Sequence, residues 1–261
     1  MKKTTLVFLC VCMLLVLLAG IFQPALCTPA EFSRLSTEDI AKTYLGKRWV
    51  ANPLAENSTN GVDCTTYVEE VLAERYDNPD MVLNYIRYRD GIAGFFNRNH
   101  FMEEMWIPNA QKYGIIAPIA LPDTSNSLMK VNLAEWYRVN PEIISKDAAY
   151  YREADVQGQF TASIPYIQSG RIDEQFLKTL PEETVVFFLR RYPKPPYQWL
   201  LNENAVMVTH MGFLFDGQRL YHASSRQKQV ISEDFSGYLL ANPGICGVMF
   251  YKMHITLPQN D

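Results

Sequence analysis

The strongest constraint on the fold is a change in residue pattern near Leu180. After this point, short apolar runs rich in β-branched and aromatic residues alternate with turn residues, which is typical of neighbouring strands. The predicted strands cover 184–189, 206–215, 220–223 and 247–253. Before Leu180, apolar residues at helical spacing predict helices over 38–44, 81–89 and 102–113, and one that starts after Asp63. Helices followed by an antiparallel sheet indicate an α+β fold.

The N-terminal segment has the layout of a secretory signal peptide. A cationic start precedes the uncharged run 6–22, and small residues stand at the cleavage positions in 25–27. A retained membrane anchor is the alternative, but the run is shorter than the about 20 residues of a membrane span. We therefore expect a signal peptide over 1–27, a bacterial protein that is periplasmic or secreted, and no stable membrane insertion after cleavage. Residues 28–261 suit a single domain, in which 84–180 form an insertion.

Composition argues against nucleic-acid binding and leaves open whether the cysteines form a disulfide. The formal net charge of −4 lacks the basic excess of a nucleic-acid-binding protein, and 48% hydrophobic residues are enough for a sizeable core. Three cysteines, Cys10, Cys12 and Cys27, lie in the predicted signal peptide, so Cys64 and Cys246 remain. In an exported protein, two cysteines either form a disulfide or keep a thiol for chemistry. Composition says nothing about the oligomeric state.

Cys64 stands at the first turn of a predicted helix, directly after the cap residue Asp63. Free N–H groups and the helix dipole at that position stabilise a thiolate, so we expect a lowered pKa for the Cys64 thiol. Cys64 shares the inward face of the helix with Val68 and Val71. The alternatives are a small buried apolar residue and a disulfide partner of Cys246.

His210 lies within the longest predicted strand. Strict alternation places His210 on one face of the sheet together with Val206, Val208, Gly212 and Leu214. A histidine among valines on a core-facing side needs a polar partner. Gly212 leaves room for a close approach beside it.

His222, on the next predicted strand, is the candidate partner. A three-residue loop at 215–217 would pair Leu214 with Gln218 and place His210 directly opposite His222 on the same face. A two-residue turn would put the two rings on opposite faces. In the first register, Cys64, His210 and His222 supply a nucleophile, a base and a group that orients the base.

The residues around these three positions resemble a known family. Residues 61–69, which read Gly-Val-Asp-Cys-Thr-Thr-Tyr-Val-Glu, resemble the nucleophile motif of NlpC/P60 proteins, and more closely that of the DUF1460 branch, described as N-acetylmuramoyl-L-alanine amidase-like. Segments 209–213 and 221–224 are similar to the two histidine strands of the family. Segments 86–91 and 97–107 are similar to regions specific to the DUF1460 branch, and the resemblance extends from about 41 to 251.

The resemblance implies a papain-like, NlpC/P60-like fold in which the nucleophile helix packs on an antiparallel sheet. It implies an exported cysteine hydrolase of peptidoglycan or muropeptides that needs no metal or cofactor. The bond cut is the one between N-acetylmuramic acid and L-Ala or the one after D-Glu. Cys64 would be the nucleophile, His210 the base and His222 the orienter. Trp49 stands where the family usually has a tyrosine. The expected substrate-binding residues are Asp63, Thr65, Trp49, Arg87, Arg89, Arg98 and His100, although His100 also fits a structural role.

Two other kinds of protein fit some of these residues. A zinc hydrolase would use Cys64, His100, His210 and His222 as ligands, but no pair of them has the tight spacing of common zinc sites. A catalytically silent wall-binding protein would tie Cys64 to Cys246. We also expect segment 87–106 to roof one end of the substrate cleft, although the segment would equally fit a small second core.

Overall fold

The computed structural model describes residues 35–53, 60–94, 97–139 and 158–253. The predicted signal peptide lies outside these residues. The helices are α2 (Thr37–Thr43), α3 (Cys64–Ala73), α4 (Pro79–Arg87), α5 (Ile107–Lys112), α6 (Leu133–Val139), α8 (Glu174–Leu177) and α9 (Phe235–Ala241). Shorter helical turns are η1 (Arg89–Gly91), η3 (Met102–Trp106) and η6 (Ser169–Arg171). The strands are β1 (Ile116–Pro118), β2 (Ser125–Asn132), β3 (Gln159–Gln168), β4 (Glu183–Tyr192), β5 (Ala205–Phe215), β6 (Arg219–Ser224), β7 (Gln229–Asp234) and β8 (Ile245–Met253).

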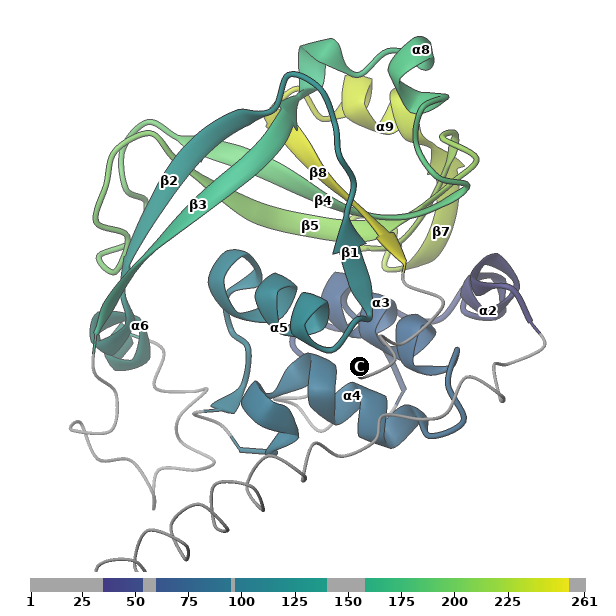
Figure 1. The fold of residues 1–261 in the computed structure, drawn as a ribbon, viewed down its shortest axis with the longest axis horizontal. Coiled ribbons are helices and arrows are strands. Elements are labelled where there is room, and N and C mark those ends of the chain that lie inside the picture. The colour runs from purple at the N-terminus through teal and green to yellow at the C-terminus, as the bar shows by residue number, and fades with distance from the viewer. Residues whose placement is uncertain (1–34, 54–59, 95–96, 140–157, 254–261) are drawn as a thin grey trace, which may run out of the picture.

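The strands form one eight-stranded antiparallel sheet in the order β2-β3-β8-β4-β5-β6-β7, with β1 pairing to β8 beside this path. Figure 1 shows a curved sheet with α3, α4 and α5 below one face and α8 and α9 on the other. A large apolar core lies between the sheet and α3 to α5, and a smaller one lies between the sheet and α8 and α9. The predicted α+β class and the packing of the Cys64 helix on the sheet are confirmed. Within the described ranges, no helix is both long and apolar enough to cross a membrane.

Helix α3 begins where the sequence predicts, because its first turn is doubly capped. The Asp63 carboxylate accepts a hydrogen bond from the Thr66 N–H at 2.8 Å, and Thr66 Oγ1 accepts one from the Asp63 N–H at 2.9 Å. Tyr67 and Val68 are fully buried, and the Tyr67 ring meets Phe213 of β5 edge-on. Each such side chain contributes roughly 1.5–3 kcal/mol when buried. This packing fixes the helix start, and therefore Cys64, against β5.

The predicted insertion 84–180 contains strands that the sequence pattern did not reveal. β2 pairs with β3 along its whole length, and β3 joins the main sheet where Ile167 faces Val248. The sheet therefore begins before Leu180, and the expected order of helices first and strands afterwards is wrong. Pro165 suggests a break, but at that residue β3 pairs only with β2, so the missing N–H can lie on the open side of the strand.

A β-bulge at Thr209 divides β5 into two parts. Phe188 of β4 pairs with His210, whereas Leu189 pairs with Val208, so Thr209 is extra. The extra residue reverses the alternation of side chains. Val208 faces the larger core, whereas His210 stacks on Phe188 in the smaller one. The expectation that Val206, Val208 and His210 share a face is therefore wrong.

Candidate active site

Cys64 and His210 border one cavity of about 230 Å³. Cys64 lies at the first residue of α3, and the backbone of Met211, the residue after His210, hydrogen-bonds to its sulfur. The bulge at Thr209 is part of the cavity wall. The remaining lining residues come from η3 and the two residues before it, from α6, from the loop before β5 and from β5 itself: His100, Phe101, Met102, Glu103, Trp136, Trp199, Met207 and Val208, with Thr65 beside the cysteine.

Behind His210, a chain of hydrogen bonds crosses three strands. His210 Nε2 lies 2.6 Å from His222 Nδ1, and His222 Nε2 lies 2.7 Å from a carboxylate oxygen of Glu233. His222 is almost completely buried, and the Tyr238 ring of α9 meets it edge to face with a centroid separation of 5.1 Å. His210 is thus held from behind by a second ring, which is held by a carboxylate.

The strand register explains why these three side chains meet. The β5–β6 loop has the predicted three residues but spans 216–218, so Leu214 pairs with Leu220 rather than with Gln218. His222 is then diagonal to His210, not directly opposite. The register differs from the expected one by two residues, which preserves the face, so the prediction that both rings share a face is confirmed.

Gly212 makes the diagonal contact possible. A Cβ atom added there would lie 2.6 Å from the Tyr221 carbonyl oxygen and 3.0 Å from His222 Cβ. The absence of a side chain lets β6 approach β5 at the residue beside His210. In the next pair of strands His222 faces Ile231, so Glu233, two residues further along β7, projects from the same face as His222.

The hydrogen-bond partners assign the tautomers of the two rings. A carboxylate only accepts hydrogen bonds, so His222 donates from Nε2 to Glu233. A neutral His222 then carries its lone pair on Nδ1, and His210 donates to it from Nε2. His210 is left with an unprotonated Nδ1, which can accept a proton.

Burial keeps the nucleophile candidate and the base candidate neutral. Burial, and secondarily the neighbouring His222, lower the pKa of His210 to about 3. Burial lowers the pKa of His222 as well and outweighs the opposing effect of Glu233. The pKa of Cys64 is raised to about 11, first by burial and then by the Asp63 carboxylate. The expected lowering of the Cys64 pKa is therefore wrong, because burial and the cap charge outweigh the stabilisation at the helix start.

Of the predicted substrate-binding residues, the structure brings Thr65 and His100 into this cavity. The His100 ring packs at a tilt against Trp136 with a centroid distance of 4.6 Å, so it belongs to an aromatic wall. The Asp63 carboxylate caps α3. Trp49 lies at the edge of the sheet, where Lys228 sits over its ring, and it is not part of the cavity lining.

The three predicted arginines do not border the cavity. The Arg87 side chain is only 12% exposed and pairs with Glu69 at 2.7 Å, and Glu69 also accepts a hydrogen bond from the Trp106 indole at 3.0 Å. The backbone of Arg98 forms an isolated antiparallel β-bridge with that of Tyr88. Of the segment 87–106, residues 100–103 line the cavity and its arginines do not, so the roof over a substrate cleft stays a prediction.

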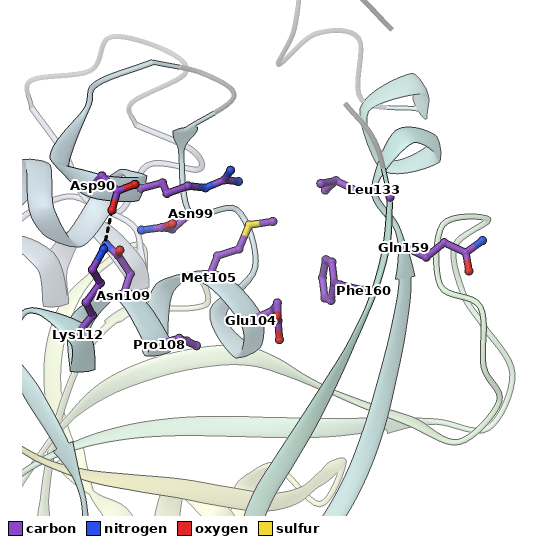
Figure 2. Close-up of a pocket in the computed structure, with 12 residues that line it drawn as sticks. Asp90, Asn99, Glu104, Met105, Pro108, Asn109, Lys112, Leu133, Gln159 and Phe160 are labelled. Carbon is purple, nitrogen blue, oxygen red and sulfur yellow. Dashed lines mark hydrogen bonds and ion pairs between the residues drawn. The ribbon is translucent and has the colours of Figure 1, made fainter. Parts of the chain in front are cut away.

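Arg89 lines a larger cavity of about 510 Å³, which does not include Cys64 or His210 (Figure 2). It lies between side chains of η1, η3 and α5 on one side and Leu133, Gln159 and Phe160 on the other. Lys112 and Asp90 form an exposed ion pair at its edge. Its greater size does not make it the candidate active site, because it contains no nucleophile paired with a base.

Neither alternative from the sequence gains support from the geometry. Cys64 and Cys246 are separate free thiols, in contrast to the disulfide of the silent wall-binding alternative. Among the described residues, no group of three or more histidine, cysteine or acidic side chains is arranged to hold a metal ion, which disfavours the proposed zinc ligand set.

Sequence reasoning missed two acidic residues of this region. Glu233 completes the chain behind His210, and Glu103 lines the cavity with a carboxylate oxygen 2.5 Å from the Val208 backbone nitrogen. Glu233 could have been found from the alternation of side chains in β7, which places it on the same face as His222. Glu103 carries no comparable signal, because it belongs to a π-helical turn.

Comparison with known proteins identifies the family. Residues 39–245 match the AmiA-like family, described as N-acetylmuramoyl-L-alanine amidase-like, so the chain belongs to this family. No curated protein matches the sequence.

Solved structures share the fold. A DUF1460 protein from Legionella pneumophila is 18% identical, with a TM-score of 0.67, 85% of this chain covered and 88% of the other. An N-acetylmuramoyl-L-alanine amidase from Bacteroides uniformis is 23% identical, with a TM-score of 0.61 and coverages of 84% and 99%. At these identities the likeness establishes the fold alone.

Proposed function

We propose that the protein is an exported cysteine hydrolase, NlpC/P60-like and related to papain, that cuts an amide bond in peptidoglycan or its soluble fragments. One observation carries the proposal. A cysteine at a helix start and a histidine at the end of a His–Glu chain border the same cavity, in a chain of the amidase-like family. Export rests on the signal-peptide pattern of residues 1–27.

The first chemical step forms a thioester. Nδ1 of His210 takes the thiol proton while Cys64 Sγ attacks the amide carbonyl, and the N–H groups at the start of α3 stabilise the oxyanion. His210 then gives that proton to the leaving nitrogen, and the carbon–nitrogen bond breaks. Because both groups rest neutral, the proton moves during attack, as in general-base catalysis, and no thiolate–imidazolium pair is needed beforehand.

Hydrolysis of the thioester completes the cycle. His210 removes a proton from water as its oxygen attacks the thioester carbonyl, and returns that proton to the sulfur when Cys64 leaves. The products are one carboxylic acid and one amine. Throughout, His222 and Glu233 hold the His210 ring in one tautomer.

The experiment is digestion of purified peptidoglycan and of soluble muropeptides, with the fragments identified by mass. We expect the wild-type protein to open an amide bond, either between N-acetylmuramic acid and L-Ala or after D-Glu, and Cys64→Ala to open none. A metal chelator should leave the wild-type activity unchanged. Cleavage by Cys64→Ala at the wild-type rate, or inactivation by the chelator, would contradict the cysteine mechanism.

A further inference from the structure

Glu103 is an acidic side chain in the wall of the cavity that Cys64 and His210 share. Glu103 lies on η3, which is a single π-helical turn. The next residue of this turn, Glu104, lines the larger cavity shown in Figure 2. Two adjacent glutamates of the same turn therefore face different cavities. Only the first of them lines the cavity that Cys64 also lines.

One oxygen of Glu103 has a structural partner. β6 pairs with β5 only from Phe213 to Phe215, so the earlier part of β5 has an edge that β6 does not cover. The Val208 N–H at that edge donates to Glu103 at 2.5 Å. This contact requires an acceptor but no negative charge, so an amide side chain would satisfy it equally well.

The negative charge of Glu103 is left without a cation. Among the described residues, no lysine, arginine or histidine forms an ion pair with it. Burial raises the pKa of the carboxyl to about 7, so ionisation is costly but possible at neutral pH. A charge in such a position is normally compensated by a partner of opposite sign.

The surroundings of Glu103 favour an organic cation as that partner. Phe101, Trp136 and Trp199 line the same cavity. Aromatic faces attract ammonium groups, and a carboxylate beside them supplies the opposing charge. Cys64 and His210 both rest neutral. The thiol therefore does not compete with Glu103 for a cation, and the imidazole does not supply a positive charge to Glu103.

We propose that Glu103 is a specificity-determining residue that binds a protonated amine on the peptide part of the substrate. The inference rests on the proposed function. Two amines in stem peptides have this chemistry: the α-amine of L-Ala, which is free only after the sugar has been removed, and the side-chain amine of a diamino acid. If the first is bound, the enzyme acts on trimmed peptides and cuts after D-Glu.

The test compares three sugar-free stem peptides as substrates of the wild-type protein, of Glu103→Gln and of a matched control, Glu104→Gln. One substrate has both amines free, and each of the other two has one amine acetylated. Glutamine keeps the acceptor for the Val208 N–H, so we expect the variant to fold. We expect acetylation of the recognised amine to lower kcat/KM of the wild-type protein by roughly 30-fold or more. Glu103→Gln should lose this preference, whereas Glu104→Gln should keep it.

Binding provides a second readout that does not depend on turnover. In Cys64→Ala, calorimetry should show tighter binding of the free-amine peptide than of its acetylated form. Equal affinity for both, or a preference that Glu103→Gln retains, would overturn the inference and leave Glu103 as an acceptor for β5. Failure of the proposed function is distinct: the wild-type protein would then hydrolyse neither these peptides nor a muropeptide that keeps N-acetylmuramic acid.

Discussion

Arg87→Ala tests whether the arginine that resembles a family motif serves the fold or the substrate. Its side chain is 12% exposed and pairs with Glu69, which is 2% exposed. The Trp106 indole donates to the second oxygen of that carboxylate. The pair joins the end of α4 to the buried side of α3, so the substitution should act through the position of the nucleophile helix.

The expected magnitude follows from the uncompensated charge. Removing one partner of a buried ion pair costs about 3–5 kcal/mol, because the other charge stays buried. For a domain of this size, each kcal/mol shifts Tm by about 2–4 °C, so the melting temperature should fall by roughly 6–20 °C. Arg89 is exposed, and Arg89→Ala should stay within about 0.5 kcal/mol of wild type.

Urea unfolding followed by circular dichroism measures both variants. Adding Glu69→Gln to Arg87→Ala should restore part of the lost free energy, since the orphaned charge is removed, with a coupling of about 0.5–3 kcal/mol. At low temperature, where Arg87→Ala remains folded, KM for a muropeptide should match wild type. An unchanged unfolding midpoint together with a raised KM would refute this reasoning and place Arg87 at the substrate.

Three other predictions concern the proposed catalytic residues and the close approach of β5 and β6 beside them. Gly212→Ala brings a Cβ to 2.6 Å from the Tyr221 carbonyl oxygen, so urea unfolding should show a loss of about 1–3 kcal/mol and kcat should fall; wild-type values of both would disprove the close approach. Glu233→Gln should lower kcat by roughly 10²-fold with KM unchanged, with partial recovery in Glu233→Asp, and an unaltered kcat would exclude Glu233 from the chain. Since the pKa of Cys64 is raised to about 11, its alkylation by iodoacetamide, followed by peptide mass to separate it from Cys246, should accelerate about tenfold per pH unit until the pH approaches about 11. A rate that levels off near pH 9 or below would show that the pKa of Cys64 is not raised.

Much of the fold was predictable where local signals were strong. The cap at Asp63 and the apolar face of α3 predicted the Cys64 helix, and the apolar runs predicted β4, β5, β6 and β8. β2 and β3 were missed because 125–132 is largely polar and Pro165 suggests a break. These strands are stabilised by pairing with each other and with β8, which no local pattern encodes.

Cys64, His210 and His222 of the candidate site were predictable from the sequence, but their geometry and the two acidic residues beside them were not. The bulge at Thr209 depends on how β5 pairs with β4, while the sequence through Val208 and His210 alternates without interruption. The raised pKa of Cys64 results from burial beneath neighbouring elements, whereas the sequence shows only a helix start. Glu103 and Glu233 acquire their positions from tertiary contacts with β5 and β6.

Steady-state kinetics of Cys64→Ala on a defined muropeptide would test most directly whether Cys64 is the nucleophile. Cys246→Ala is the matched control. Both thiols are free and partly buried, so the two variants remove similar groups. Cys64→Ala should fold normally and lose at least about 10⁴-fold in kcat, whereas Cys246→Ala should keep the wild-type rate. A folded Cys64→Ala protein with wild-type kcat would contradict the assignment of Cys64 as the nucleophile.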